Sequence, residues 1–373
     1  MGGRDTVAPP VPIRRPAPDR TRRPVPDRSA PTSVTAARSS RLHPGTPVFE
    51  PDGNDWIATF TVAAAAVPSS TTAVFLDVNC VTDRSVLTSG AMTPDPGGDS
   101  WTHSVRVPAG WRGAYCFIPS DAPITGPEPG EHERDWWIRF RRNALDVVEG
   151  ATPDAPSQQL WTGDTPGGVL TSEVVTLDGI RRTVHTYVPP APGRGTVVLF
   201  DGDEIRRHRV LAAFDHTGIS PAQVLTVDHT STDGRTVRES DLTANPRFRD
   251  DLLRLTGGPV VVGGCSYGGL AAMYFALTRP DVVVGAACLS PSMWWHDDHG
   301  RDIPTIAGAD RGGTVPVHCE TGSLEWLMLD EVASTTDRLA AAGHPVRSGT
   351  FAGGHDWVQW RERLPTLITG LLR

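Results

Sequence analysis

The sequence predicts an α/β domain with a mostly parallel sheet, preceded by a small all-β domain and an N-terminal tail. The 373 residues are enough for two domains. Short runs that alternate apolar and polar residues fill the stretch from about 45 to 120, which is typical of strands with one buried face. From about 196 onward, continuous apolar runs alternate with helix-like segments, which indicates a sheet covered on both faces.

Residues 1–43 form the predicted tail. Two Arg- and Pro-rich units, Arg14–Arg20 and Arg22–Arg28, follow each other, and nine arginines stand against three aspartates. Proline removes backbone donors and few apolar residues are available for a core, so we expect a disordered or polyproline-like segment. Three interpretations of this segment stay open: contact with an anionic surface or nucleic acid, a neutral extension, and a misplaced start codon.

The all-β domain, with the connector behind it, is assigned to residues 44–165. Proline, glycine and aspartate separate its short strands, which favours a small β-sandwich. The part from 121 onward is rich in the same residues and is predicted to be a connector, in which Trp136–Arg141 forms a short element. The strands expected here are Trp56–Val62, Ala73–Val78, Trp101–Val107 and Gly113–Ile118.

The α/β domain is assigned to residues 166–373. It is expected to open with an antiparallel hairpin, in which Asp178-Gly179 makes the turn between Thr171–Leu177 and Arg182–Val188. Buried strands are then expected at Thr196–Phe200, Gln223–Val227, Pro259–Gly263, Val282–Leu289, Val315–Cys319 and Thr350–Phe351, and helices at Pro246–Leu255, Leu270–Thr278 and Glu325–Ala342.

Composition excludes several classes of protein. The formal net charge of −8 argues against nucleic acid as the main partner. No apolar run approaches the roughly 20 residues of a membrane-spanning helix, and no apolar segment of a secretory signal stands near the start. Five cysteines without a C-x-x-C pair read as reduced thiols rather than as a disulfide or zinc framework. We therefore expect a cytoplasmic protein with neither a membrane partner nor a metal site.

One motif carries chemistry. Gly264-Cys265-Ser266-Tyr267-Gly268 is a G-x-S-x-G sequence that stands between a β-branched strand and an Ala-rich helix. This context is that of the nucleophile elbow of α/β-hydrolases, where a sharp turn projects the serine hydroxyl above the sheet. Ser266 is the predicted nucleophile; the alternative is a serine that only caps a Gly-rich helix.

A serine hydroxyl needs a base and a site for the developing oxyanion. His355 is the predicted base, because it comes after the last expected strand and two glycines, Gly353 and Gly354, precede it. The predicted oxyanion donors are two backbone N–H groups, that of Tyr267 after the nucleophile and that of Asp203 after an early strand. An ordinary turn at the end of that strand is the alternative for Asp203.

At this point the chain resembles the enterochelin (ferric enterobactin) esterase family, from about residue 45 to the end. The resemblance implies an early-set-like β-sandwich followed by an α/β-hydrolase domain of esterase-D type. It also implies hydrolysis of the tri-serine lactone of a catecholate siderophore in the cytoplasm, with no cofactor, because the iron belongs to the substrate. The stretches that carry it are Leu199–Gly202, Arg238–Phe248, Cys265–Leu270, Leu289–Trp295, Glu320–Trp326 and Gly353–Arg361.

Two departures from the family bear on which siderophore is the substrate. Asp203-Glu204 places carboxylates where relatives often carry an aromatic or amide side chain. A ferric tris-catecholate is trianionic, so these carboxylates would repel it unless they point away. The connector also lacks the family's Asp-Pro-Leu-Asn stretch.

The acid that orients the histidine has two candidates. Relatives of esterase-D type carry it three residues after a glycine, which here indicates Glu325 after Gly322. Glu320 is the competitor, and otherwise would hold the loop by accepting backbone N–H bonds. A Ser–His pair without any acid is the third alternative.

Substrate contacts are predicted at Arg238, Trp295 and Trp357, because an anionic aromatic ligand suits arginine forks and aromatic walls. Each tryptophan could equally be a structural wedge, and Arg238 could instead pair with Glu239 or Asp241. Two other functions remain open: a general carboxylesterase or acyltransferase on the same scaffold, and a siderophore-binding protein without activity.

Overall fold

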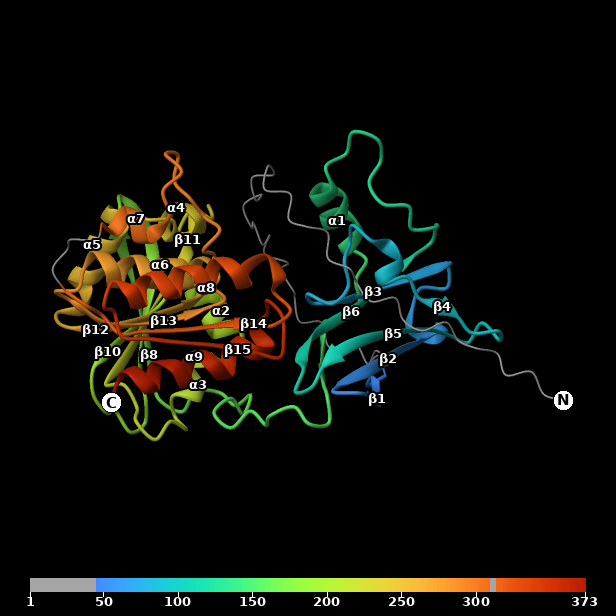
Figure 1. Cartoon of the computed structure of the whole chain (residues 1–373), viewed down its shortest axis with the longest axis horizontal. Coiled ribbons are helices and arrows are strands. Elements are labelled where there is room, and N and C mark those ends of the chain that lie inside the picture. The colour runs from blue at the N-terminus through green and yellow to red at the C-terminus, as the bar shows by residue number, and fades with distance from the viewer. Residues whose placement is uncertain (1–44, 309–312) are drawn as a thin grey trace. The chain divides into compact units, whose positions relative to one another are not determined.

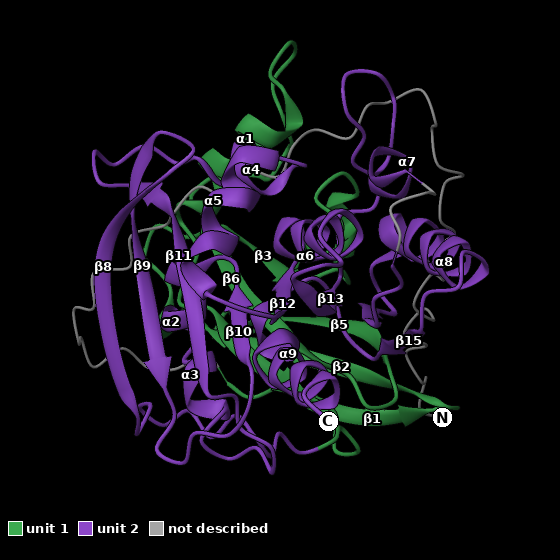
Figure 2. Cartoon of the chain, turned by 90° about the vertical axis from the view of Figure 1, so that its left-hand side faces the viewer, with its two compact units in different colours: residues 1–156 green, residues 157–373 purple. Residues whose placement is uncertain are grey.

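The structure is a computed structural model that describes residues 45–308 and 313–373 (Figure 1). The chain divides into two compact units at Pro156/Ser157, which we call unit 1 and unit 2 (Figure 2). The tail predicted at 1–43 lies outside the described residues.

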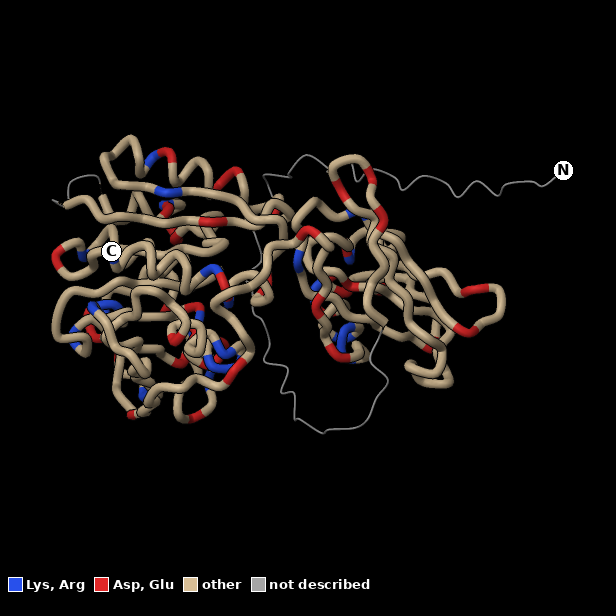
Figure 3. The backbone as a smooth tube through the Cα atoms, turned by 90° about the horizontal axis from the view of Figure 1, so that it is seen from below, with Lys and Arg blue, Asp and Glu red and all other residues tan. Residues whose placement is uncertain are grey.

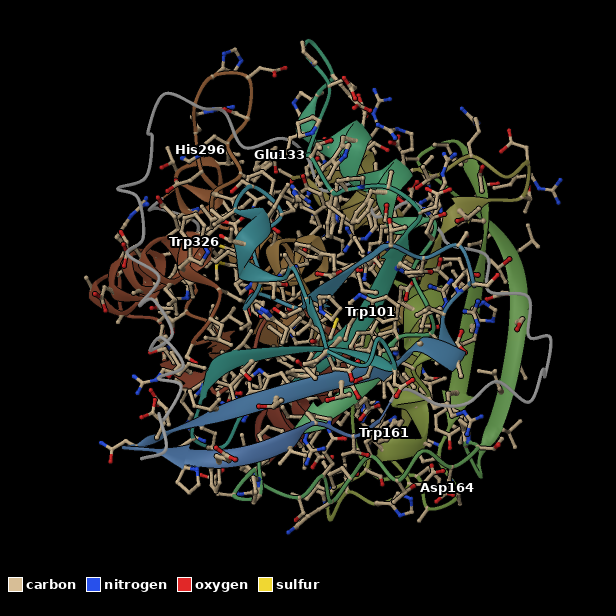
Figure 4. All side chains as sticks on the ribbon, turned by 90° about the vertical axis from the view of Figure 1, so that its right-hand side faces the viewer. Trp101, Glu133, Trp161, Asp164, His296 and Trp326 are labelled. Atoms are coloured by element: carbon tan, nitrogen blue, oxygen red, sulfur yellow. The ribbon has the colours of Figure 1, made fainter. Side chains whose placement is uncertain are left out.

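The division comes before the boundary expected at 165/166, because the segment after Ser157 is bound to unit 2. The Glu362 carboxylate accepts the backbone N–H groups of Gln159, Leu160 and Trp161 at 2.7–3.2 Å. Trp161, labelled in Figure 4, also lies under the guanidinium of Arg361, 3.3 Å from its ring centroid.

Unit 1 contains two antiparallel sheets. Phe60 and Tyr115 come from different sheets and their ring centroids lie 4.8 Å apart, so the sheets pack face to face. This confirms the predicted β-sandwich. One sheet has the order β1-β2-β5-β4 and the other β3-β6-β7, with β1 Val48–Asp52, β2 Asp55–Ala63, β3 Ala73–Val78, β4 Thr93–Pro94, β5 Ser100–Pro108, β6 Arg112–Ser120 and β7 Val148–Ala151.

The expected connector has structure of its own inside unit 1. Helix α1 (Glu133–Arg141) contains the short element expected at Trp136–Arg141. Its Trp137 and Phe140 rings meet Phe75 of β3 edge to face, at 5.8 and 6.3 Å. The sequence thus predicted the element but placed its start three residues late, because Pro- and Gly-rich sequence precedes it.

Unit 2 is built on an eight-stranded sheet of order β15-β14-β13-β12-β10-β11-β9-β8. Strands β10 to β15 run parallel to one another. β8 and β9 form the predicted antiparallel hairpin, which the structure places at one edge of the sheet. The strands are β8 Val169–Leu177, β9 Ile180–Val188, β10 Thr196–Leu199, β11 Gln223–Ser231, β12 Val260–Cys265, β13 Val283–Leu289, β14 Val317–Gly322 and β15 Val346–Phe351.

Helices cover both faces of this sheet, as the apolar strands require. Val198, Val262 and Cys288 face a core shared with α6, while Val197, Val261 and Ala287 face a second core shared with α9. Figure 2 shows α6 and α9 on opposite sides of β12 and β13. The helices are α2 Gly202–Arg207, α3 Val210–Ala213, α4 Arg238–Leu242, α5 Pro246–Thr256, α6 Tyr267–Thr278, α7 Ile303–Ala307, α8 Trp326–Ala341 and α9 Trp357–Leu371.

Helix α9 is the largest element that the sequence analysis missed. Pro365 lies inside it and reads as a helix breaker. Asp356 caps its first turn by accepting the N–H of Val358 at 2.9 Å. Within the described ranges, each helix is too short or too polar to span a bilayer.

Candidate active site

Ser266 occupies a strained turn between β12 and α6. Its backbone has φ 57° and ψ −122°, a conformation that a residue with a side chain rarely adopts. The two ends of the motif touch: a Cβ on Gly264 would lie 2.6 Å from the backbone carbon of Gly268. Only glycine at position 264 permits this closure, so the sequence motif and the turn geometry have the same cause.

Hydrogen bonds hold Ser266 in place, and burial makes the neighbouring Cys265 thiol unsuitable as the nucleophile. The Ser266 N–H donates to the carbonyl of Leu289 at 2.9 Å, and its Oγ lies 3.4 Å from Oγ of Ser292. The adjacent Cys265 is buried, and burial raises the pKa of its thiol well above the ordinary value. Cys265 is therefore a protonated thiol at neutral pH, and thiolate chemistry is unavailable there.

His355 and Glu325 form a close pair. The Nδ1 atom of His355 lies 2.7 Å from Oε2 of Glu325, and the Glu325 side chain is 1% exposed against 25% for His355. Glu325 stands at the N-cap position of α8. Glu320, the competing candidate, lies within β14 and its carboxylate instead binds the Arg363 guanidinium at 2.7 Å.

The loop that carries Glu325 is hydrogen-bonded to the loop that carries His355. Ser323 and Leu324 donate their N–H groups to the carbonyls of Phe351 and Gly353, at 2.8 and 3.1 Å. The N–H of Gly322 donates to Oε1 of Glu325 at 2.7 Å. Holding this loop through a backbone N–H was a role expected of Glu320; in the structure Glu325 has it.

The second predicted oxyanion donor lies at the start of α2. Asp201 precedes it with a left-handed backbone, φ 58°, which turns the chain so that Asp203 lies in the first helical turn. Arg238 binds the Asp201 carboxylate through Nε and Nη2 at 2.5 and 2.9 Å. The same guanidinium packs over the Tyr267 ring, 5.4 Å from its centroid. One cation thus contacts both segments that supply the predicted donors.

This geometry corrects the expected partners of Arg238. Its carboxylate partner is Asp201 rather than Glu239 or Asp241, and the buried Asp241 is bound by Arg182 and His229. Tertiary folding brings Asp201 next to Arg238, so the partners expected from proximity in the sequence were wrong.

The other arginines near the loop are also paired. Arg206 binds both oxygens of Asp228 at 2.7 and 3.0 Å, and Arg207 binds Glu204 at 2.6 Å. Figure 3 shows the same mixture of basic and acidic positions along the described backbone of unit 2. Arginine forks for an anionic ligand are therefore already neutralised by neighbouring carboxylates.

Asp203 differs from its acidic neighbours. Burial, followed by the charges of Asp201, Asp228 and Glu204, raises the pKa of its carboxyl above the usual value. At Asp201 the Arg238 guanidinium outweighs burial and lowers the pKa. The predicted oxyanion loop thus carries a carboxyl that its surroundings disfavour as an anion.

Three tryptophans line the neighbourhood of these loops. Trp294 packs on the Tyr267 ring at 5.7 Å, and Trp295 packs against the core on the α6 side. Trp357 stacks on His208 at 5.1 Å with an interplanar angle of 11°. Trp295 and Trp357 are both only partly buried, so each retains surface that a ligand can contact.

Two residues to which the sequence analysis assigned no role, Ser290 and Trp360, stand next to the acid. Ser290 Oγ lies 2.5 Å from Oε1 of Glu325, and Nε1 of Trp360 donates to that Ser290 oxygen at 3.0 Å. Both occur in stretches that resemble the family, which was the available signal. Among the described residues, no group of three or more His, Cys, Asp or Glu side chains is arranged to hold a metal ion.

Comparisons with known proteins agree with this architecture. A family model described as "Enterochelin esterase, N-terminal" matches residues 58–161, and one described as "Putative esterase" matches residues 246–370. The iron(III) enterobactin esterase of Dickeya dadantii (strain 3937) is 28% identical over 352 residues, covering 77% of this chain and 80% of the relative. The iron(III) salmochelin esterase of Escherichia coli O6:H1 is 27% identical over 338 residues, covering 78% of this chain and 82% of the relative.

A solved structure shares the fold across most of the chain. The ferric enterobactin esterase of Salmonella typhimurium superposes with a TM-score of 0.73 at 22% identity, covering 88% of this chain and 96% of that protein. Both predicted domains are therefore found together, and in the same order, in a known esterase. The chain belongs to the enterochelin esterase family.

Proposed function

We propose that this protein is a serine esterase that hydrolyses the trilactone ester bonds of a catecholate siderophore and so releases its iron. The observation that carries the proposal is the buried Glu325 carboxylate 2.7 Å from Nδ1 of His355, in a domain whose Ser266 occupies a nucleophile elbow. The substrate class is supported by the relatives, which are iron(III) enterobactin and iron(III) salmochelin esterases.

In the acylation step, His355 Nε2 takes the proton of the Ser266 hydroxyl as its oxygen attacks the lactone carbonyl. The Glu325 carboxylate accepts a hydrogen bond from the Nδ1–H of His355, which keeps Nε2 available as the base and stabilises the imidazolium that forms. The backbone N–H groups of Tyr267 and Asp203 stabilise the oxyanion. As the tetrahedral intermediate collapses and the ester C–O bond breaks, the imidazolium protonates the departing alkoxide, which leaves as the serine hydroxyl of the substrate.

In the deacylation step, His355 removes a proton from water, which attacks the acyl-enzyme and frees Ser266. The cycle repeats for each ester of the trilactone. The three catecholates then no longer form one ring-tethered chelator, which weakens their hold on the metal through lost effective concentration. Iron is part of the substrate throughout and no protein-bound cofactor takes part.

The proposal also covers the residues that contact the substrate and the cellular location of the reaction. Trp295 and Trp357 are the proposed aromatic contacts of the catechol rings. Arg238 is proposed to act on substrate only indirectly, by holding Asp201 and Tyr267 in place. A cytoplasmic location is proposed from the cysteine usage, and cell fractionation tests it.

The decisive assay is mass spectrometry of products from cyclic and linear catecholate trimers, each with and without iron. We expect catecholate-serine monomers and dimers from the wild type, and none from Ser266→Ala. The matched control is Ser348→Ala, which removes an exposed hydroxyl on β15, and is expected to match the wild type.

The other two functions give different results in the same assay. Turnover of a p-nitrophenyl ester without turnover of any catecholate trimer would make the protein a general carboxylesterase or acyltransferase. Tight binding of the siderophore without turnover of either substrate would make it a binding protein.

A further inference from the structure

Ser290 is buried directly behind the acid of the proposed triad. It follows β13, has no exposed surface and has φ +43°, in the left-handed region that a residue with a side chain rarely adopts. Its N–H donates to the carbonyl of Glu320 at 2.7 Å. A backbone conformation of this kind persists only where the surrounding contacts require it, so the packing around Ser290 fixes the position of its side chain.

The direction of the hydrogen bonds at Ser290 follows from the chemistry of its partners. The indole Nε1–H of Trp360, 3.0 Å from Ser290 Oγ, is a donor only. Ser290 Oγ must therefore accept at that contact. Its single hydrogen is left for Oε1 of Glu325, 2.5 Å away.

The two oxygens of Glu325 consequently have separate partners. Oε1 accepts from Ser290 and from the N–H of Gly322, at 2.5 and 2.7 Å. Oε2 is left for Nδ1 of His355 at 2.7 Å. Two donors on one oxygen fix the rotation of the carboxylate, and this rotation aims the other oxygen at the imidazole.

Trp360 contacts both ends of this arrangement. Its ring meets the His355 imidazole edge to face, with centroids 4.6 Å apart and an interplanar angle of 86°. It is 5% exposed, so its N–H has no solvent to replace Ser290. Trp360 therefore limits the tilt of the His355 imidazole. It also orients the Ser290 hydroxyl, which in turn orients the Glu325 carboxylate.

We propose that Ser290 is a positioning residue of the esterase, which sets the His355 tautomer and orientation through Glu325, with Trp360 fixing the direction of the Ser290 hydroxyl. The inference rests on the proposed function, because it assigns Ser290 a role only if Glu325 is the acid. A merely structural serine at the end of β13 would affect folding but not the chemistry of Glu325.

The test is a double-mutant cycle of Ser290→Ala and Glu325→Gln, with kcat and KM measured on a p-nitrophenyl ester and on the catecholate trilactone. A hydrogen bond to a charged group supports a loss of about 10- to 100-fold in kcat for Ser290→Ala, with KM changed less than about threefold. In the Glu325→Gln background the same change is expected to cause no further loss. An additional tenfold loss there would show that Ser290 acts by another route and would overturn the proposal.

Two further variants separate position from folding. Ser290→Gly removes the hydroxyl but accepts the positive φ without strain, so we expect the kcat of Ser290→Ala at an equal or higher Tm. Trp360→Phe keeps the ring edge and loses the donor, and is expected to reduce kcat less than Ser290→Ala. Ser231→Ala, which removes a buried hydroxyl at the end of β11, is the control with unchanged kcat.

A readout independent of turnover completes the test. The Nδ1–H proton of His355 is expected as a downfield NMR resonance in the wild type, weakened or shifted in Ser290→Ala. Wild-type activity and an unchanged resonance in Ser290→Ala, with Glu325→Gln inactive, would refute this inference alone. An active Glu325→Gln would instead refute the proposed triad.

Discussion

Replacing Glu325 by glutamine is expected to give the protein a histidine with the wrong tautomer. Ser290 and Gly322 both donate to Oε1, so the glutamine oxygen must take that position. Its amide NH₂ then faces Nδ1 of His355, where Oε2 stood at 2.7 Å. Nδ1 has to accept, the ring proton moves to Nε2, and Nε2 no longer serves as a base for Ser266.

The expected loss follows from that geometry. The corresponding change of tautomer in serine proteases costs on the order of 10⁴ in kcat, about 5.4 kcal/mol of transition-state stabilisation. We expect a loss between about 10² and 10⁴, toward the upper end because both donors to Oε1 come from fixed groups. The Tm is expected to change little, since glutamine still accepts the bonds from Ser290 and Gly322.

Glu320→Gln is the matched control, because it alters the competing glutamate, which lies on β14 and whose partner is Arg363. That partly exposed pair contributes about 0–1 kcal/mol to stability, and kcat is expected to stay within about threefold of the wild type. Initial rates with both substrates and thermal melts of both variants are the measurements. A large loss in Glu320→Gln with full activity in Glu325→Gln would refute the reasoning.

Four further outcomes are expected. Ser266→Ala should lower kcat by on the order of 10⁶ at unchanged Tm, checked by burst-free initial rates and a melt; residual activity in a clean preparation would contradict it. Deleting residues 1–43 should change neither Tm nor kcat, because the segment offers few apolar side chains; a drop of several degrees would contradict it. Gly322→Ala should lower both Tm and kcat, since its Cβ would lie 2.5 Å from the Gly353 carbonyl oxygen and 2.7 Å from Oε1 of Glu325; a variant that matches the wild type in both would contradict it. The raised pKa of Asp203 means that its native carboxyl ionises after the unfolded one, so stability is lost as pH rises above about 4. Asp203→Asn should therefore gain stability relative to the wild type between about pH 4 and 7 and none below, in denaturant melts, and should favour the ferric trianion in competition with the iron-free trimer; equal stability at every pH would contradict the first expectation.

Local sequence was sufficient for much of this molecule. Alternating and continuous apolar runs predicted the β-sandwich and the doubly covered parallel sheet, because strand burial follows from side-chain period. The elbow could be predicted for the same reason: its glycines and its strand and helix are adjacent in the chain. Helix α9 was not predicted because its sequence contains Pro365, and packing against β12 and β13 stabilises the helix despite that proline.

Long-range contacts decided the rest. Arg238 meets Asp201 rather than a neighbouring acid because β10 and α4 converge near the elbow, which no local pattern reveals. Glu325 and Glu320 are five positions apart and chemically alike. The loop that carries Glu325 is bonded to the His355 loop and brings Glu325 to the imidazole, whereas Glu320 lies on β14 and binds Arg363. Ser290 and Trp360 lie 70 residues apart, yet they share one hydrogen bond behind the acid. The spacing of apolar side chains and the residue preferences of turns reflect interactions between neighbours in the chain. The orientation of a carboxylate depends instead on hydrogen-bond donors that only folding brings together.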